Sequence, residues 1–193
     1  MDDGKGGHMS QRKALWTGVA LGVAGLTAIT AAVGLTTVYS GAFNVAATEQ
    51  HSAFARWALD TTYHNSIQTR ARSVRAPEQI TPQMLEAGAT AYKSMCQHCH
   101  AGPGVERDKW ASGMRPRPPH LVEAAADWEQ NEIFWIAKQG VKMSGMPAFG
   151  PTHDDQTLWG VAAFVKQLPG MDAARYSAMG AAQSGSSGDR HGH

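Results

Sequence analysis

The stretch Cys96-Gln97-His98-Cys99-His100 has the C-x-x-C-H form that marks the attachment site of a c-type haem. Two thiols separated by two residues can each add to one vinyl group of the same porphyrin. The adjacent imidazole of His100 then lies beneath the iron as an axial ligand. The motif therefore predicts one covalently attached haem c, held by Cys96, Cys99 and His100.

Two other kinds of site use a pair of cysteines at this spacing. A thioredoxin-like redox pair expects a βαβ pattern around the motif, and a structural zinc site expects a second Cys or His pair at matching spacing. The sequence shows neither pattern. The motif also contains both cysteines of the chain, so no thiol is left for a disulfide. Haem attachment is the interpretation that the remaining residues have to fit.

An apolar segment before the motif is long enough to cross a membrane. No charged residue occurs from Ala14 to Thr48, and Leu15 to Tyr39 is dense in Ala, Val, Leu, Ile, Gly and Thr. A bilayer core needs about 20 apolar residues in a helix. A cleaved signal peptide, with Val45-Ala46-Ala47 as its cleavage site, is the alternative, but its apolar core is usually about 7 to 15 residues long. We therefore expect an uncleaved single-span anchor.

The charges that flank this segment predict its orientation. Three Lys or Arg residues precede it, whereas only Arg56 lies in the corresponding stretch after it. The positive-inside bias then places the N-terminus in the cytoplasm. Because haem c is attached outside the cytoplasmic membrane in bacteria, we expect a periplasmic haem domain fixed to the inner membrane. The net charge of +1 argues against a nucleic-acid partner.

Composition divides the chain into five segments. We expect a polar cytoplasmic tail (1–13), a transmembrane anchor (14–40), a partly helical periplasmic connector (41–79), a haem domain (80–176) and a disordered Gly/Ser-rich tail (177–193).

The connector is too aromatic and too rich in Arg for a flexible tether. Four of its apolar residues fall roughly on one helical stripe: Phe54, Trp57, Ala58 and Ile67. Three Arg residues follow within 70–75. A solvated helix surface and a docking surface for a partner subunit both explain this composition.

Capping residues and periodicity predict three helices in the haem domain: Thr81 into Cys96, Asp127 to Lys138, and Asp155 to Leu168. Thr81 is a good N-cap, and Pro82 suits the first helical position. Gly88 and Tyr92 lie four residues apart and hence on one face, where Gly88 permits close approach by the last helix. No convincing pair of alternating strands appears, so the predicted fold class is all-α.

The loop after the middle helix contains the candidate for the sixth iron ligand. Met146 lies between Gly145 and Pro147, so a constrained loop can present its thioether to the iron. Met143 is the competing candidate, although a packing role at the helix end suits it better. A His–Met pair leaves no vacant iron site, and Met ligation raises the reduction potential. These ligands favour single-electron transfer over oxygen chemistry or a small-molecule substrate, and hence a protein that is not itself an enzyme.

Together these features resemble a membrane-anchored bacterial class I cytochrome c over about residues 80–170. The resemblance rests on the C-x-x-C-H motif, Gly88 with Tyr92, the Met146-Pro147 loop and the closing helix with Trp159. It implies a small helical fold in which the first and last helices cross near the haem, with His100 and Met146 as axial ligands. In that family a proline carbonyl commonly accepts a hydrogen bond from the proximal His, and Pro103 is one match.

The expected function is that of a membrane-tethered mono-haem electron carrier. It would act alone or with a respiratory complex, such as a quinol-oxidising enzyme, a terminal oxidase or a periplasmic dehydrogenase. A gas-binding sensor or enzyme with a displaceable Met146, and an assembly subunit in which the haem is secondary, are the alternatives. Four basic residues are candidates to border the haem edge or pair its propionates, unless they are simply solvated: Arg115, Arg117, Lys138 and Lys142.

Overall fold

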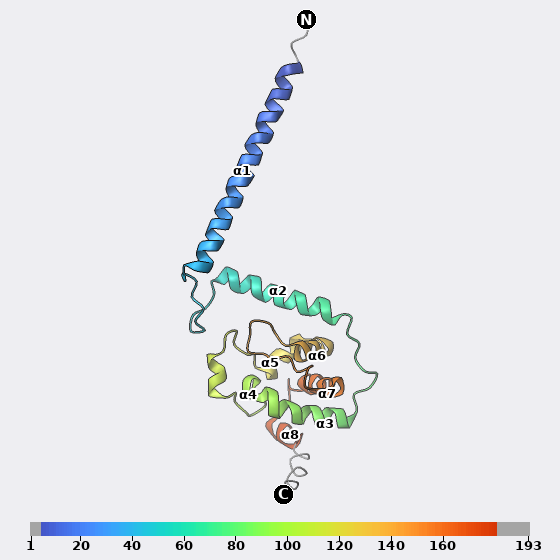
Figure 1. Cartoon of the computed structure of the whole chain (residues 1–193). Helices are drawn as coiled ribbons and strands as arrows, with labels where there is room; N and C mark the ends of the chain where they lie inside the picture. Colours follow the sequence, from blue (N-terminus) through green and yellow to red (C-terminus); the bar gives the residue numbers. More distant parts are fainter. Residues whose placement is uncertain (1–4, 181–193) are drawn as a thin grey trace, which may run out of the picture. The chain divides into compact units, whose positions relative to one another are not determined.

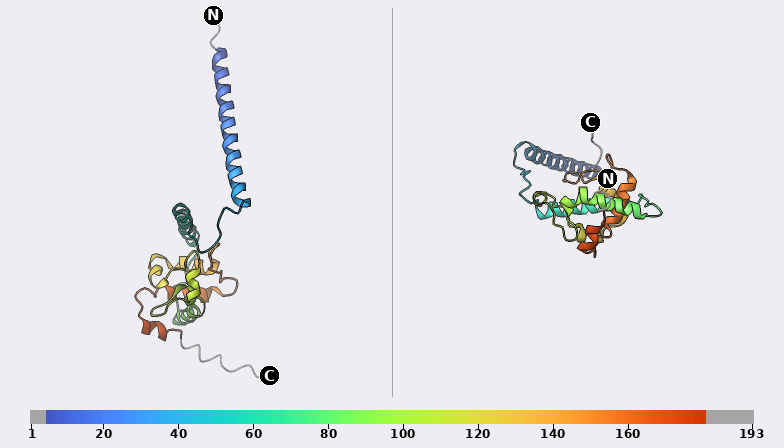
Figure 2. Two further views of the ribbon diagram at one scale, coloured as in Figure 1. Left: turned by 90° about the vertical axis from the view of Figure 1, so that its left-hand side faces the viewer. Right: turned by 90° about the horizontal axis from the view of Figure 1, so that it is seen from below.

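The computed structural model describes residues 5–180, in which every regular element is a helix (Figure 1). The chain forms two compact units, Met1–Glu49 and Gln50–His193. The first unit contains α1 (Lys5–Tyr39), a single unbroken helix in both views of Figure 2. Its Gln11–Tyr39 portion is long and apolar enough to cross a membrane by length and composition. The helix begins at Lys5, within the segment expected to be a polar tail.

Helix α2 (Ala53–Ala71) occupies the connector, as the sequence suggested, and its C-terminal half packs on α6 (Gln130–Gln139). Ile67 and Ala71 are buried, and Asn131 Nδ2 donates a hydrogen bond to Ala71 O at 2.8 Å. The His64 ring stacks on Trp128 with ring centroids 4.7 Å apart. This half of the connector therefore packs against α6 within the second unit.

The apolar stripe expected along α2 is only partly buried. Phe54 is 74% exposed and Trp57 is 62% exposed, whereas Ile67 is 2% exposed. At 100° per residue, Phe54 lies about 140° around the helix from Ile67, which is too far for one packed face. The prediction of a single stripe was wrong for the first turns of α2, whose aromatic pair faces away from the packed side.

The predicted helix into the cysteine motif is confirmed, with one local change. Thr81 Oγ1 accepts a hydrogen bond from Met84 N at 3.2 Å, and Pro82 opens α3 (Pro82–Ala91). A π-helical turn, Tyr92–Cys96, then joins α3 to the short helix α4 (Gln97–His100). Such turns insert a residue into the helical ladder and are frequent at functional sites.

The first and last helices of the domain cross at two glycines. An ideal Cβ at Gly88 would overlap the backbone of Gly160 in α7 (Asp155–Val165), and one at Gly160 would overlap Met84 O. Only residues without a side chain allow the two backbones to approach this closely. The expected close approach at Gly88 is confirmed, and every residue of α7 from Leu158 to Val165 is buried.

The middle helix begins later than predicted. It starts at Gln130 because Glu129 and Glu132 form a reciprocal capping box, while Trp128 is extended. The preceding residues form the short helices α5 (Leu121–Ala124) and η3 (Ala125–Asp127). Phe134 of α6 stacks on Trp159 of α7 with ring centroids 4.0 Å apart, which joins the middle and last helices in the core.

A further helix, α8 (Ala173–Ala178), extends past the boundary expected at residue 176. Tyr176 is buried, and Gly180 N donates a hydrogen bond to Glu86 Oε1 at 2.5 Å. The segment up to Gly180 therefore packs on α3. The rest of the tail expected to be disordered, residues 181–193, lies outside the described residues, as do residues 1–4 of the N-terminal tail.

Candidate haem site

The C-x-x-C-H motif lies across the junction of the π-helical turn and α4. Cys96 ends the turn, and Cys99 and His100 lie on the single turn that follows. Both thiols are free and half-buried. Burial raises the pKa of the Cys96 thiol to about 12, and it raises the pKa of the Cys99 thiol as well. Both groups are therefore protonated thiols at neutral pH, and Cys96 packs against the hydrophobic core.

The His100 imidazole is oriented by a backbone carbonyl. Its Nδ1 lies 2.9 Å from Pro119 O, so the donor is Nδ1–H and the acceptor is that carbonyl. The opposite nitrogen, Nε2, is then left as the one that can bind a metal. Burial is the main cause that lowers the pKa of His100, which favours the neutral imidazole that metal ligation requires.

The resemblance suggested Pro103 as the source of this carbonyl, and the structure corrects that assignment to Pro119. Pro103 is buried in the turn directly after the motif. The proline-rich segment 115–121, which contains Pro119, instead returns to the imidazole from further along the chain. Arg107 Nη1 donates to Pro118 O at 2.7 Å and so fixes the peptide next to the acceptor. The choice among four nearby prolines depends on this tertiary contact.

The two methionines of the loop after α6 differ in exposure. Met143 is 92% exposed and has a left-handed backbone conformation with φ 59°. Met146 is half-buried, its backbone N–H bonds Ser144 Oγ at 3.1 Å, and its carbonyl accepts from Val141 N at 3.2 Å. The loop therefore closes on itself around Met146, whose side chain is less exposed than that of Met143.

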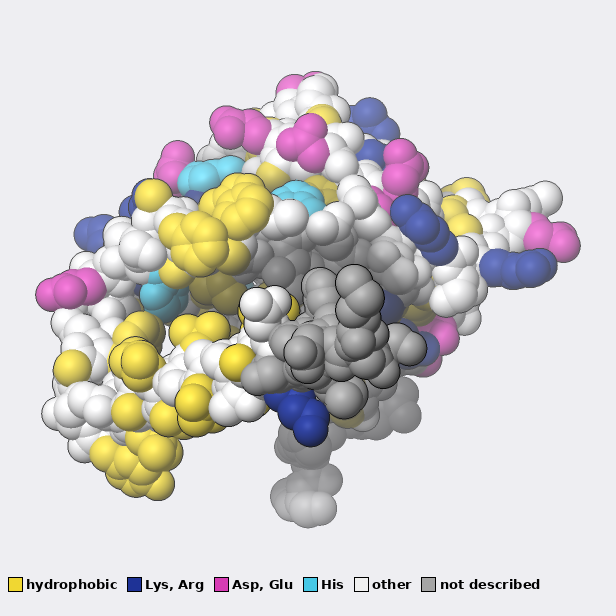
Figure 3. All heavy atoms as spheres, turned by 90° about the horizontal axis from the view of Figure 1, so that it is seen from above, with side chains coloured by type: hydrophobic (Ala, Val, Ile, Leu, Met, Phe, Trp, Pro, Cys, Tyr) yellow, Lys and Arg dark blue, Asp and Glu magenta, His cyan; other side chains and the backbone are white. Residues whose placement is uncertain are grey.

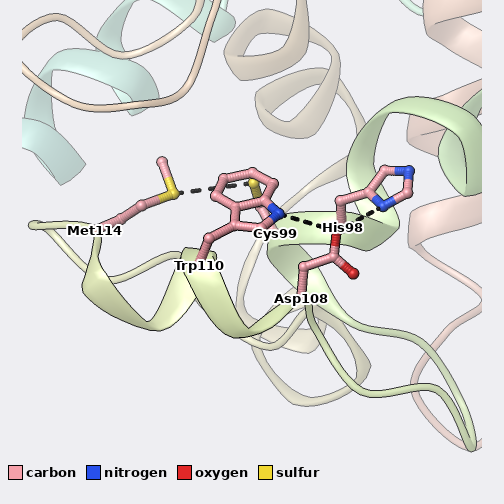
Figure 4. Close-up of polar contacts among 5 residues, drawn as sticks. All are labelled: His98, Cys99, Asp108, Trp110 and Met114. Atoms are coloured by element: carbon pink, nitrogen blue, oxygen red, sulfur yellow. Dashed lines mark hydrogen bonds and ion pairs between the residues drawn. The ribbon is translucent and has the colours of Figure 1, made fainter.

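A cluster of side chains that the sequence did not predict surrounds Cys99 (Figure 4). Asp108 Oδ2 lies 3.1 Å from His98 Nδ1 and accepts a hydrogen bond from Trp110 Nε1 at 3.0 Å. Met114 Sδ lies 4.0 Å from Cys99 Sγ. The segment after the motif is thus tied back to it at several points. Asp108 and Trp110 match no spacing pattern that would have singled them out.

Helix α8 supports the motif from another side. Tyr176 OH donates to Gln97 Oε1 at 2.6 Å, and Tyr92 OH donates to Ala101 O at 2.7 Å. Lys93 Nζ donates to Ser177 O at 3.2 Å. These bonds hold both ends of α4. They depend on tertiary contacts that no local sequence pattern predicts, and the bond to Ser177 involves the tail that was expected to be disordered.

The four basic candidates have different environments. Lys138 pairs with Asp155 at 2.6 Å and so links α6 to α7, whereas Arg117 and Lys142 are exposed. Arg115 Nη1 donates to Ser112 O and Met114 O, but its Nε is buried without a hydrogen-bond partner. A buried orphan donor on the loop that supplies Pro119 fits an anionic group such as a haem propionate.

The site's residues fit haem c better than a zinc ion. Within residues 5–180, no three His, Cys, Asp or Glu side chains gather in a way that could hold a metal ion. Two free thiols, an oriented imidazole and an unpaired buried donor are instead the groups that a covalently attached porphyrin requires.

Comparison with known proteins agrees with this geometry. Residues 83–165 match the family model described as cytochrome c oxidase, cbb3-type, subunit III. The match includes the C-x-x-C-H motif and the Met146 loop. Residues 83–165 form a c-type cytochrome domain. None of the curated proteins compared with it matches the chain. The matched residues include the crossing of α3 and α7, whereas α1, α2 and α8 lie outside them.

Proposed function

We propose that this cytochrome is a membrane-tethered mono-haem carrier of single electrons on the periplasmic face of a bacterial inner membrane. The observation that carries the proposal is the bond between His100 Nδ1 and Pro119 O at 2.9 Å. It occupies Nδ1 and so leaves Nε2 of a neutral imidazole as the nitrogen that would bind the iron of a haem attached to the two cysteines. Such second-shell orientation is typical of metal-ligating histidines.

Each site residue has a distinct task in this proposal. Cys96 and Cys99 would attach the porphyrin, and His100 Nε2 and Met146 Sδ would bind the iron. When bound, the haem supplies an iron that gains or loses one electron. The proline-rich loop and the closed Met146 loop hold both axial ligands in one arrangement. Little rearrangement is then needed when the oxidation state changes.

The rest of the chain supports a membrane anchor and a respiratory partner. The apolar helix α1 is long enough to span a bilayer, and the charge bias around it supports a cytoplasmic N-terminus. The matched family is named for an oxidase subunit, which supports a respiratory complex as partner. Charged side chains of both signs are scattered over the face shown in Figure 3, so neither sign dominates on that face.

Substitution of the two loop methionines tests the proposal. The ferric wild type should show the long-wavelength visible band of an iron–thioether bond and should bind no carbon monoxide when reduced. Met146→Ala should lose the band, bind carbon monoxide and have a lower midpoint potential, because Met ligation raises the potential. Met143→Ala is the matched control in the same loop and should behave as wild type. A wild type that lacks the band and binds carbon monoxide would instead favour the gas-binding alternative.

A further inference from the structure

One side of α2 is exposed along its whole length. Helix α2 runs along the outside of the second unit and packs on α6 (Figure 1). At 100° per residue, six residues from its first turn to its C-cap fall within about 80° of one another, and they are centred roughly 120° from the buried Ile67. All six are exposed: Phe54, Trp57, Thr61, Asn65, Gln68 and Arg72. We call these six residues the outer flank.

The outer flank is aromatic at the end that follows α1 in the chain. Phe54 and Trp57 are 74% and 62% exposed, and their ring centroids lie 5.7 Å apart, so the two side chains form one patch. Tryptophan is enriched where proteins meet the membrane–water interface, because its ring is apolar while its N–H stays close to water. The pair therefore suits the surface of a bilayer.

The charges of α2 fit a bilayer surface as well. The outer flank contains no acidic residue, and its one charged residue is Arg72 at the far end. The charged residues of the first two turns, Arg56 and Asp60, lie about 160° and 120° around the helix from Phe54. The flank can therefore meet phospholipid headgroups without burying a carboxylate, and Arg72 can pair with their phosphate groups.

A short tether keeps the outer flank near the membrane. Residues 40–52 connect α1 to α2, and turns shorten them: Ala46 N bonds Asn44 Oδ1 at 2.9 Å, and Glu49 N bonds Ala46 O at 3.2 Å. Even a flexible chain of this length has an end-to-end distance of only about 20 Å. Tethering at such a distance gives an effective concentration on the order of millimolar, so a weak interfacial affinity is enough for binding.

We propose that the outer flank binds the same lipid bilayer that α1 spans, with Phe54 and Trp57 in the interface and Arg72 at the headgroup phosphates. This inference rests on the part of the proposed function that makes α1 a membrane anchor. It gives the chain two membrane contacts, one spanning and one interfacial. Because α2 also packs on α6, the second contact limits how far the haem domain can move from the membrane.

Fluorine nuclear magnetic resonance can place Trp57 relative to the bilayer. The full haem-loaded chain is labelled with 5-fluorotryptophan and reconstituted in nanodiscs of phosphatidylcholine and phosphatidylglycerol, and each signal is assigned by a Trp→Phe substitution. Trp110 is the matched control, because it is 60% exposed against 62% for Trp57 and lies in the haem domain. A gadolinium-chelating lipid should broaden the Trp57 signal more than that of Trp110, and a water-soluble gadolinium chelate should do the reverse.

A carboxylate on the outer flank should remove the contact. With Phe54→Asp, the Trp57 signal should lose its broadening by the gadolinium lipid and become as sensitive to the soluble chelate as that of Trp110. Leu59→Asp is the matched control, because Leu59 is 57% exposed in the same half of α2 but lies about 140° around the helix from Phe54. It should leave the Trp57 pattern unchanged. Since both side chains are exposed, the circular dichroism and the midpoint potential of both variants should match wild type.

The outcomes distinguish this inference from the proposed function. If Trp57 and Trp110 respond alike in the wild type, or if Leu59→Asp acts like Phe54→Asp, the outer flank is not a membrane contact. Protection of Trp57 from both reagents would show that protein rather than lipid covers the flank, which also overturns the inference. A chain that alkaline carbonate washes from vesicles has no membrane anchor, which overturns that part of the proposed function. A chain that stays anchored while Trp57 remains in water overturns the outer-flank contact alone.

Discussion

The crossing of α3 and α7 and the two segments that contain the proposed ligands His100 and Met146 are built in opposite ways. At the crossing, Gly88 and Gly160 bring two backbones together, and the surrounding side chains are buried. In the two ligand segments, the end of α4 and the loop after α6, His100 and Met146 are half-buried and are positioned by a few polar bonds. The crossing is therefore a packed scaffold, whereas the two ligand segments are held by a few contacts. The positions of their side chains should set the redox properties. Substitutions in the first should change stability, and substitutions in the second should change the redox properties.

The largest effect is expected at the crossing. Gly88→Ala places a methyl group on the backbone of Gly160, and neither helix can move away without disturbing the core. The free energy of unfolding should fall by about 3 kcal/mol. Thermal unfolding followed by circular dichroism measures this loss, with Gly113→Ala as the control, because nothing lies within 4 Å of a Cβ there. Equal stability of the two variants would show that the crossing is not tightly packed.

The sequence predicted the packed scaffold of α3 and α7 better than the contacts of the two ligand segments. Thr81 with Pro82, and Gly88 on the inner face of its helix, are local signals that a single helix displays in its own residues. The acceptor for His100 is different, because several prolines follow the motif and only the folded path of the chain brings Pro119 to the imidazole. Met146 was chosen because Gly145 and Pro147 constrain its backbone. That it is less exposed than Met143 could be seen only in the folded loop.

The cluster around Cys99 and the packing of α2 were missed for the same reason. Asp108 joins His98 to Trp110 through contacts that no periodic pattern encodes. Four apolar residues of α2 were expected to lie on one stripe, yet its packed face is decided by Trp128, which lies far along the chain. Long-range partners, rather than local propensity, determine which side of such a helix is covered.

A smaller loss of stability is expected when the hydrogen bond from Arg107 to the proline-rich segment 115–121 is removed. Arg107→Ala removes the bond to Pro118 O and so loosens the neighbouring carbonyl that accepts from His100. Unfolding free energy should fall by about 2 kcal/mol, as for a hydrogen bond to a charged group. The midpoint potential should rise, because a weaker bond at Nδ1 makes the imidazole a less basic ligand.

Arg117→Ala is the matched control for that change, since Arg117 is an exposed residue of the same loop. It should leave both the stability and the potential near their wild-type values. Redox titration and chemical denaturation of the two variants provide the measurement. A drop in stability without any change in potential for Arg107→Ala would mean that Pro119 keeps its place without the arginine. The proline-rich segment would then contribute to stability rather than to the redox properties.

The smallest effect is expected at Thr81, the N-cap of α3, because it belongs to the packed scaffold and lies far from the cysteine motif. Thr81→Ala removes the hydroxyl that accepts from Met84 N at 3.2 Å, which should cost about 1 kcal/mol of unfolding free energy. Thr81→Ser keeps an acceptor at the same place and should recover most of that loss. Neither variant should alter the visible spectrum or the midpoint potential, because the cap lies at the far end of α3 from the motif. A shifted potential in Thr81→Ala alone would show that the scaffold transmits small changes in helix stability to the ligands, so that stability and redox properties are not separable in this domain.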